Sequence, residues 1–277
     1  MAVNFKTYFR LLGAYARMDL AWFLRDTKYC LLFMLADSVS ALAAVTGTLL
    51  LSARLGGFGG LSQDQVLFML GFALGVEGVF SLFFVNNNAS HISRVIGRGQ
   101  LDHVMIMPVP LPIHLFTHGF APCTGVTTLL VGVGMLTLAT IRLGIAVTPL
   151  WVLTLIGCLL LGVSIIFSVI YIISSLAFYA PAASEEIAGT AHGLFSMKGY
   201  PLGNLPPLWQ GLLCTVVPVG AVAYLPARAL LGQGGLVGAV ALVAAVFGLT
   251  AFICFRRGLR HYARIGCSRY LPFGHRS

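Results

Sequence analysis

Residues 96–116, IGRGQLDHVMIMPVPLPIHLF, organise the rest of the chain, because this polar, basic and proline-rich interval lies between long apolar runs. Gly97 and Gly99 loosen the backbone at its start, and residues 100–107 can form about two helical turns. Three prolines, which lack an amide hydrogen and clash with the preceding turn, then prevent that helix from continuing: Pro108, Pro110 and Pro112. The segment therefore predicts a short, abruptly ended helix beside a membrane-spanning segment.

Composition indicates the class of protein. Of the 277 residues, 58% are hydrophobic and only 9% are charged, with a mean hydropathy of +0.92, whereas an average soluble domain has roughly 25% charged residues. We therefore expect an all-α integral membrane protein. Its formal charge of +9 does not indicate a nucleic-acid partner, because the basic residues gather at the ends of apolar segments.

The cysteines and the N-terminus exclude several other classes. The six cysteines lack the paired spacing of a zinc site, a redox motif or a disulfide framework, so we interpret them as small buried hydrophobic residues. The N-terminal segment is charged throughout and has no small-residue cleavage site, so we expect it to belong to the mature protein.

Apolar segments near the roughly 20 residues needed to cross a bilayer are the clearest structural signal. They lie at residues 30–52, 65–85, 115–140, 150–178 and 236–255. Residues 4–26 instead mix basic and aromatic side chains, which predicts a helix lying in the membrane interface rather than an extension of the first span. Residues 89–114 form the proline-stopped inner loop.

The fifth of six expected spans has two competing assignments. In one, residues 184–200 form a weak fifth span and residues 201–235 fold back at the outer surface; in the other, residues 212–231 are the span. Pro218, Pro226 and Arg228 favour a broken, re-entrant pair of helices, because irregular backbone at membrane depth must be covered by protein. Both assignments give the same topology.

Two carboxylates lie inside predicted spans, where an ionisable side chain is costly and indicates a functional role by default. Asp37 lies near the start of the first span, and Glu77 lies near the middle of the second. Either residue can line a translocation path or an interface between subunits, or be a structural group satisfied by a neighbouring helix.

The distribution of basic residues predicts the orientation. With both ends in the cytosol, 13 of the 17 Lys and Arg residues lie on the inner side, as the positive-inside tendency requires. These are Lys6, Arg10, Arg17, Arg25, Lys28, Arg94, Arg98, Arg256, Arg257, Arg260, Arg264, Arg269 and Arg276. We expect the basic C-terminal segment to face anionic lipid.

Three motifs resemble the permease subunits of type-2 (ABC-2 type) ABC exporters, and the resemblance extends over nearly the whole chain. The first is the glycine-rich turn, Leu-Asp pair and proline end of residues 96–116. The second, FSMKGYPLGNLPPLWQGLLCTVVPVGAVAYLPARALLG, is similar to a bacterial branch in which two related permeases accompany one ATPase. The third is FRRGLRHYARIG, in which Gly258, Leu259, Arg260 and Tyr262 match.

The resemblance implies that residues 97–107 dock into a nucleotide-binding subunit as a coupling helix. The residues assigned to this contact are Arg98, Gln100, Leu101, Asp102, His103 and Met107. Relatives usually have a leucine and an arginine before the proline, where this chain has HVMIMP, so the contact is expected to be less charged here.

The resemblance also favours the weak fifth span, with residues 201–235 as the outer re-entrant segment. The matching positions are Tyr200, Pro201, Pro206, Pro218, Tyr224 and Pro226. It implies a bacterial cytoplasmic-membrane location with both termini cytosolic.

No Gly-x-x-x-x-Gly-Lys-Ser/Thr phosphate loop occurs in these 277 residues, so ATP and Mg²⁺ are expected on a partner ATPase and this chain is expected to bind no cofactor. The other expected partners are membrane lipid and a second permease, either a sister chain or a second copy. The few polar residues in the spans favour a hydrophobic or amphiphilic substrate.

Two other functions remain open at this stage. An ion-coupled secondary transporter would use Asp37 and Glu77 and predicts an internal repeat, which the sequence lacks. A lipid-modifying enzyme would need polar groups at one membrane face, for which Glu185, Glu186 and His192 are the best candidates. We assign no catalytic or metal-binding residue, because Asp102 and His103 have no nucleophile or metal-ligand partner at usable spacing.

Overall fold

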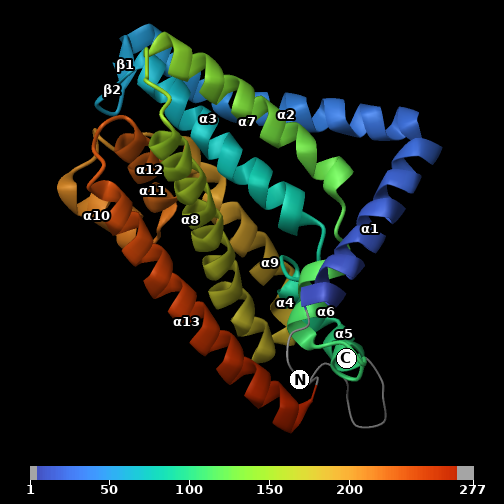
Figure 1. Ribbon diagram of the computed structural model, residues 1–277. Coiled ribbons are helices and arrows are strands. Elements are labelled where there is room, and N and C mark those ends of the chain that lie inside the picture. The colour runs from blue at the N-terminus through green and yellow to red at the C-terminus, as the bar shows by residue number, and fades with distance from the viewer. Residues whose placement is uncertain (1–4, 267–277) are drawn as a thin grey trace.

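The computed structural model describes residues 5–266, which are almost entirely helical apart from one two-stranded hairpin (Figure 1). An all-helical integral membrane protein is therefore confirmed. Four predicted positions lie outside the described residues: Asn4 of the interfacial helix, and Cys267, Arg269 and Arg276 of the tail.

Among residues 5–266, four helical segments are long and apolar enough to cross a membrane. They are α2 (Thr27–Leu55), α3 (Gln63–Phe80) with its π-helical end η1 (Ser81–Val85), α8 (Pro149–Ser174) with the 3₁₀ turn η2 (Ser175–Phe178), and α13 (Leu236–Ile265). A bent helix pair adds a fifth if it is counted as one span. The six-span arrangement thus stays a prediction.

The first two helices form a corner at one side of the bundle (Figure 1). Helix α1 (Phe5–Arg25) ends where Asp26 leaves the helical conformation, at φ −126°, and α2 begins at Thr27. Helix α2 is mostly exposed in the isolated chain, with Leu31, Leu32 and Leu35 facing outward. A separate N-terminal helix is therefore present, and its location in the interface remains a prediction.

The core of the bundle is the close pair of α3 and α7 (Pro122–Arg142), whose backbones nearly touch. A Cβ added to Gly78 would lie 2.3 Å from Cα of Leu129, and one added to Gly132 would lie 2.6 Å from the amide nitrogen of Gly75. Small residues allow such contact in membrane helices, where dispersion between close backbones replaces the hydrophobic effect. Phe68 and Phe72 of α3 are fully buried.

Three short helices form the inner loop: α4 (Ile92–Gly97), α5 (Gln100–Met105) and α6 (Leu111–Thr117). The predicted third span, residues 115–140, is wrong at its start, because α6 ends at Thr117 and α7 begins at Pro122. Gly119 causes the break: it has a left-handed φ of +86°, and its Cβ would lie 2.4 Å from the carbonyl oxygen of Asn86. Proline at a first helical position then starts α7.

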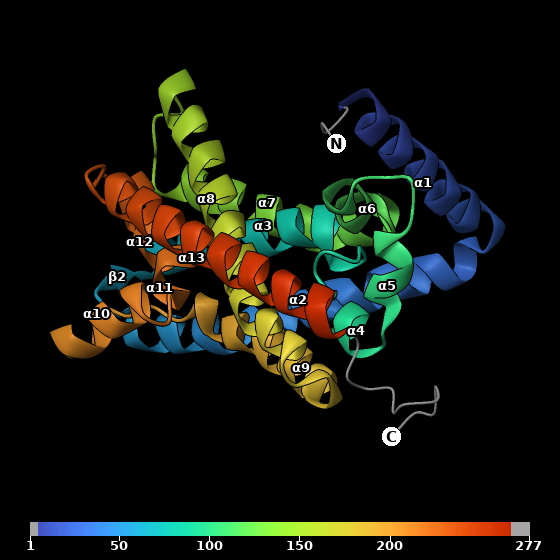
Figure 2. The same ribbon diagram turned by 90° about the horizontal axis from the view of Figure 1, so that it is seen from below.

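The segment after α8 contains the 3₁₀ turn η3 (Pro181–Ala183), α9 (Ser184–Gly193) and the 3₁₀ helix η4 (Leu194–Gly199). The helical residues 184–199 correspond to the weak fifth span, although they do not reach the length of the four clear spans. Helix α9 begins beside α4. Figure 2, which views the bundle from below, shows α4, α5 and α6 grouped there, with α9 and the end of α13 nearby.

Residues 201–235 contain α10 (Pro207–Thr215), α11 (Val219–Val222) and α12 (Tyr224–Leu230), bent by 68° after α10. This bend suits either a broken span or a re-entrant segment. The hairpin of β1 (Gly57–Phe58) and β2 (Leu61–Ser62) lies against its start, because a Cβ on Gly59 would lie 2.4 Å from Cβ of Pro201. Both elements lie at the end of the bundle opposite α4–α6, and the described ends of α1 and α13 point toward the α4–α6 end (Figure 1).

Candidate functional site

Helix α5 presents one face to its own chain and the other to solvent. Leu101 and Val104 are buried at 0% and 5% exposure, whereas Ile106, just beyond the helix, is 80% exposed. Helical spacing explains the division, since residues three apart lie on the same side. The exposed side also carries Gln100, Asp102, His103, Met105 and Met107. Leu101 therefore anchors the predicted coupling helix, and the other residues form its accessible surface.

Two arginines of the inner loop share one carboxylate on α9. The Nε atom of Arg94 donates to Glu185 at 2.7 Å, and an NH2 group of Arg98 donates to the other carboxylate oxygen at 2.8 Å. The hydrogen bond from Arg98 lowers the pKa of Glu185, partial desolvation opposes this effect, and Arg94 adds to it. Arg98 thus binds within the chain, and Glu185 ties the loop to α9.

Gly97 lies at the contact between α4 and the start of α9. A Cβ at this position would lie 2.3 Å from Cβ of Ser184 and 2.7 Å from the carbonyl oxygen of Pro181. Gly97 itself is helical, and it is Gly99 that has the left-handed φ of +68°. The prediction that both glycines loosen the backbone is therefore corrected: Gly99 makes the turn, and Gly97 allows close packing.

A histidine pair lies beside this contact. The rings of His91 and His192 stack with centroids 5.6 Å apart. Burial lowers the pKa of His91, and the neighbouring His192 and Arg94 lower it further. His192, together with Glu185, was a candidate for an enzymatic site. Both lie in helix-packing contacts, and Glu186 is exposed.

Asp37 binds α7 through two threonines. Its carboxylate accepts hydrogen bonds from the hydroxyls of Thr127 and Thr128, the second at 2.9 Å. Both threonines are 6% exposed. The carboxylate therefore has the neighbouring-helix partners that a structural role requires, and a role in the translocation path remains a prediction.

Glu77 forms an ion pair with Lys198. The Nζ atom of Lys198 lies 2.8 Å from the carboxylate, and the lysine side chain is only 14% exposed. The pair joins α3 to η4, which follows α9. Charged groups at membrane depth require such a partner. The weak fifth helix thus carries an ionic contact at each end, Glu185 toward the inner loop and Lys198 toward α3.

The predicted outer motif is divided between buried and exposed positions. Tyr224 and Pro226 are buried in α12, whereas Tyr200 is 51% exposed. Arg228 donates to the hydroxyl of Tyr224 at 3.2 Å, and the indole nitrogen of Trp151 donates to the carbonyl of Leu230 at 3.2 Å. The remaining prolines of the motif adjoin turns or helix starts: Pro201, Pro206 and Pro218. Trp151 thus joins α8 to α12, Tyr224 makes its hydrogen bond within α12, and the role of the outer motif stays a prediction.

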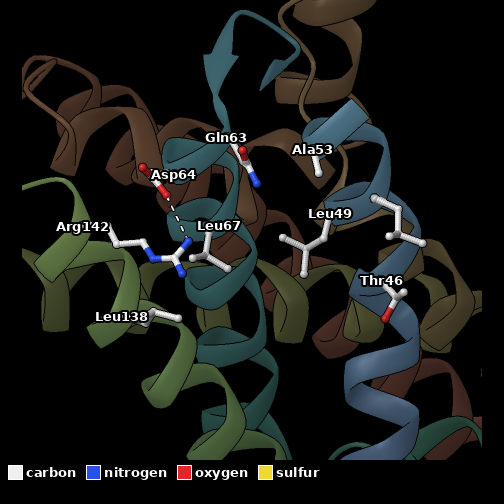
Figure 3. Close-up of a pocket in the computed structure, with 9 residues that line it drawn as sticks. Thr46, Leu49, Ala53, Gln63, Asp64, Leu67, Leu138 and Arg142 are labelled. Atoms are coloured by element: carbon white, nitrogen blue, oxygen red, sulfur yellow. Dashed lines mark ion pairs between the residues drawn. The ribbon is translucent and has the colours of Figure 1, made fainter. Parts of the chain in front are cut away.

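A hollow of about 400 Å³ lies between α2, α3 and α7 at the hairpin end (Figure 3). Asp64 and Arg142 point toward one another at its rim, 3.6 Å apart and partly exposed. Apolar side chains, among them Leu49 and Leu67, form its walls. Such partly exposed ion pairs contribute little to stability.

Several contact residues were not assigned these roles from sequence. The sequence located Glu185 only as an enzymatic candidate, did not place Lys198 on either side, and did not single out Met105 and Ile106. The basic pair Arg94 and Arg98, four residues apart on a short helix, was a usable signal for a shared acidic partner. Among residues 5–266, no group of three or more His, Cys, Asp or Glu side chains is arranged to hold a metal ion.

Comparison with known proteins gives the family. A family model described as "ABC-2 family transporter protein" matches residues 39–266, which include every helix from the greater part of α2 to the end of α13. No curated protein and no solved structure gives a significant match. The extent of the family match and the multi-span helical fold lead to one conclusion: the chain belongs to the ABC-2 family of transporter proteins and is an ABC transporter permease.

Proposed function

We propose that this permease is the membrane subunit of an exporter in which a separate ATPase polypeptide binds ATP and Mg²⁺ and drives transport through α5. The expected cargo is hydrophobic or amphiphilic. The conduit consists of two permeases, a sister chain or a second copy beside this one. The location is the bacterial cytoplasmic membrane, with both termini cytosolic.

The exposed side of α5 is the observation that carries this proposal. Three large apolar residues are solvent-exposed there in the isolated chain: Met105 at 43%, Ile106 at 80% and Met107 at 43%. They lie at the same end of the bundle as the basic end of α13 (Figure 1), and the proposed orientation puts this end in the cytosol, outside the lipid core. Exposed apolar side chains with polar neighbours mark protein interaction sites, and Asp102 and His103 are the polar neighbours here.

A route for force transmission leads from this surface into the bundle. Leu101 and Val104 anchor α5, and the salt bridges of Arg94 and Arg98 connect the adjoining α4 to Glu185 on α9. The helical segment continues through η4 and leads into residues 201–235 at the opposite end. We propose that ATP-dependent movement of α5 tilts α9 and thereby shifts the outer segment. Such coupling requires two conformations whose populations ATP changes.

The first test is to tag the chain, extract it gently from its native membrane and identify the co-purifying proteins by mass spectrometry. We expect a soluble ATPase, with a second six-span permease if the assembly is a heterodimer. Recovery of this chain alone, together with transport that survives ATP depletion, would overturn the proposal in favour of an ion-coupled secondary transporter.

A point variant locates the contact. Ile106→Ser should lower the recovery of the ATPase about tenfold, because truncating a central apolar contact costs on the order of 1–2 kcal/mol. Ile265→Ser is the matched control, since Ile265 is 62% exposed at the end of α13. Equal recovery for both isoleucine variants would show that α5 is not the docking surface.

The double replacement of Asp102 and His103 by alanine should leave membrane insertion intact and uncouple ATP hydrolysis from transport.

A further inference from the structure

An apolar groove of about 520 Å³ opens between α6, α8 and α13. Aromatic rings line it in a continuous row: Phe116 lies 5.2 Å from Phe167, Phe167 lies 4.6 Å from Tyr171, and Tyr171 lies 5.1 Å from Phe255, measured between ring centroids. The volume is in the range of about 300–1,000 Å³ typical of ligand sites. The groove can therefore admit a flexible apolar chain.

The groove carries one basic side chain among its lining residues. Arg256 lies on its lining, with its guanidinium carbon 5.8 Å from the centroid of the Phe252 ring. Arg257, Arg260 and Arg264 follow on the same helix, and the sequence contains no Asp or Glu after Glu186. A basic pocket between helices at a membrane surface favours an anionic lipid headgroup. The charge of this groove therefore selects an anionic partner.

A buried polar group beside the groove lacks a partner within the described residues. The hydroxyl of Tyr171 is buried and makes no hydrogen bond within the described residues, although its ring lines the groove. Tyr171 is 8% exposed. The exposed part of Tyr171 therefore does not include its hydroxyl, and the residue adds to the apolar lining of the groove through its ring.

We propose that the groove binds an anionic phospholipid from the leaflet on the α4–α6 side. One acyl chain lies along the aromatic row, and Arg256 holds the phosphate. Helix α6 forms one wall through Leu115 and Phe116. The lipid consequently braces the segment that follows α5 and makes the position of α5 sensitive to lipid charge.

Photolabelling tests the site directly. The full chain is reconstituted in phosphatidylethanolamine vesicles containing a small fraction of phosphatidylglycerol with a diazirine on one acyl chain. After irradiation, labelled peptides are quantified by mass spectrometry. Peptides from α2 serve as the internal reference for bulk lipid, because Leu32 and Leu35 are 65% and 62% exposed. We expect labelling of Phe167 and Phe255 peptides to exceed that of α2.

Matched variants separate the site from general charge effects. Arg256→Gln should reduce the excess label about fivefold, and Arg257→Gln, which removes the same charge outside the groove, should leave it unchanged. Gly248→Phe should abolish the excess by filling the groove, and Gly238→Phe, at an open position on the same helix, should not. Tyr171→Phe should leave it unchanged, because the hydroxyl is not accessible from the groove.

Three results would overturn the proposal: labelling no greater than that of α2, equal effects of the Arg256 and Arg257 variants, or equal excess with a diazirine-bearing phosphatidylethanolamine. The measurement requires neither ATP nor a partner protein. Its failure would leave the proposed ATP-driven function intact, and failure to recover an ATPase would leave the lipid site intact.

Discussion

Replacing Gly97 by alanine should separate α4 from α9. The added Cβ would lie 2.0 Å from Oγ and 2.3 Å from Cβ of Ser184, whereas carbon atoms in contact are about 3.5–4.0 Å apart. Rotating the serine moves Oγ but leaves Cβ in place, so the helices must move apart by about 1 Å. The hydrogen bonds from Arg94 and Arg98 to Glu185, at 2.7 and 2.8 Å, would then stretch beyond useful length.

The expected net cost is about 1–2 kcal/mol. Overpacking costs about 1–3 kcal/mol, and alanine in place of a helical glycine returns about 0.5–1 kcal/mol of backbone entropy. Gly189→Ala is the matched control on α9, because a Cβ there meets nothing within 4 Å. It should be neutral or stabilising.

Hydrogen exchange of α4 and α9 peptides in detergent, with the melting temperature as a second readout, measures the effect. Gly97→Ala should speed exchange in both helices and lower the melting temperature, and Gly189→Ala should do neither. Adding Ser184→Gly to Gly97→Ala should restore part of the protection, because it removes the two nearest atoms, Oγ and Cβ of Ser184. The reasoning is refuted if the two alanine variants behave alike, or if Ser184→Gly gives no rescue.

Three further outcomes are expected. The folded-state pKa of Glu185 is lowered, so the ionised carboxylate stabilises the folded state. This stabilisation is fully present above the unfolded-state pKa of about 4.3 and disappears as the pH falls through the lowered pKa. The melting temperature should therefore drop in acid for the native chain and for Glu186→Gln, but less for Glu185→Gln, and equal acid sensitivity would contradict this. Glu77→Gln or Lys198→Met alone should destabilise by about 1–3 kcal/mol, and exchanging the two charges should restore part of the loss; a double variant worse than both singles would argue against the pair. Leu101→Ala should cost about 2–5 kcal/mol, seen as faster hydrogen exchange throughout α5, and unchanged exchange would show that Leu101 is not an anchor.

Local patterns predicted much of the helical architecture. The end of the second predicted span coincides with the end of η1 at Val85, and the predicted last span lies within α13. The sequence predicted an inner helix over residues 100–107 that ends at the prolines, and α5 ends two residues earlier, at Met105. These features depend on hydropathy and backbone chemistry within a few consecutive residues. For the same reason Gly119 and Pro122 were available as signals for the break before α7, and the apolar run around them obscured that break.

The sequence by itself determined the membrane class, the approximate spans and the position of the short inner helix, because each follows from side-chain solvation and local backbone restrictions. Only the tertiary structure decided that Glu185 binds Arg94 and Arg98, 91 and 87 residues away, and that Glu77 binds Lys198. It also decided that Gly97 allows close packing and that α6, α8 and α13 enclose an apolar groove. These contacts depend on how helices rotate and cross against one another, and the periodicity of a single helix does not specify that geometry.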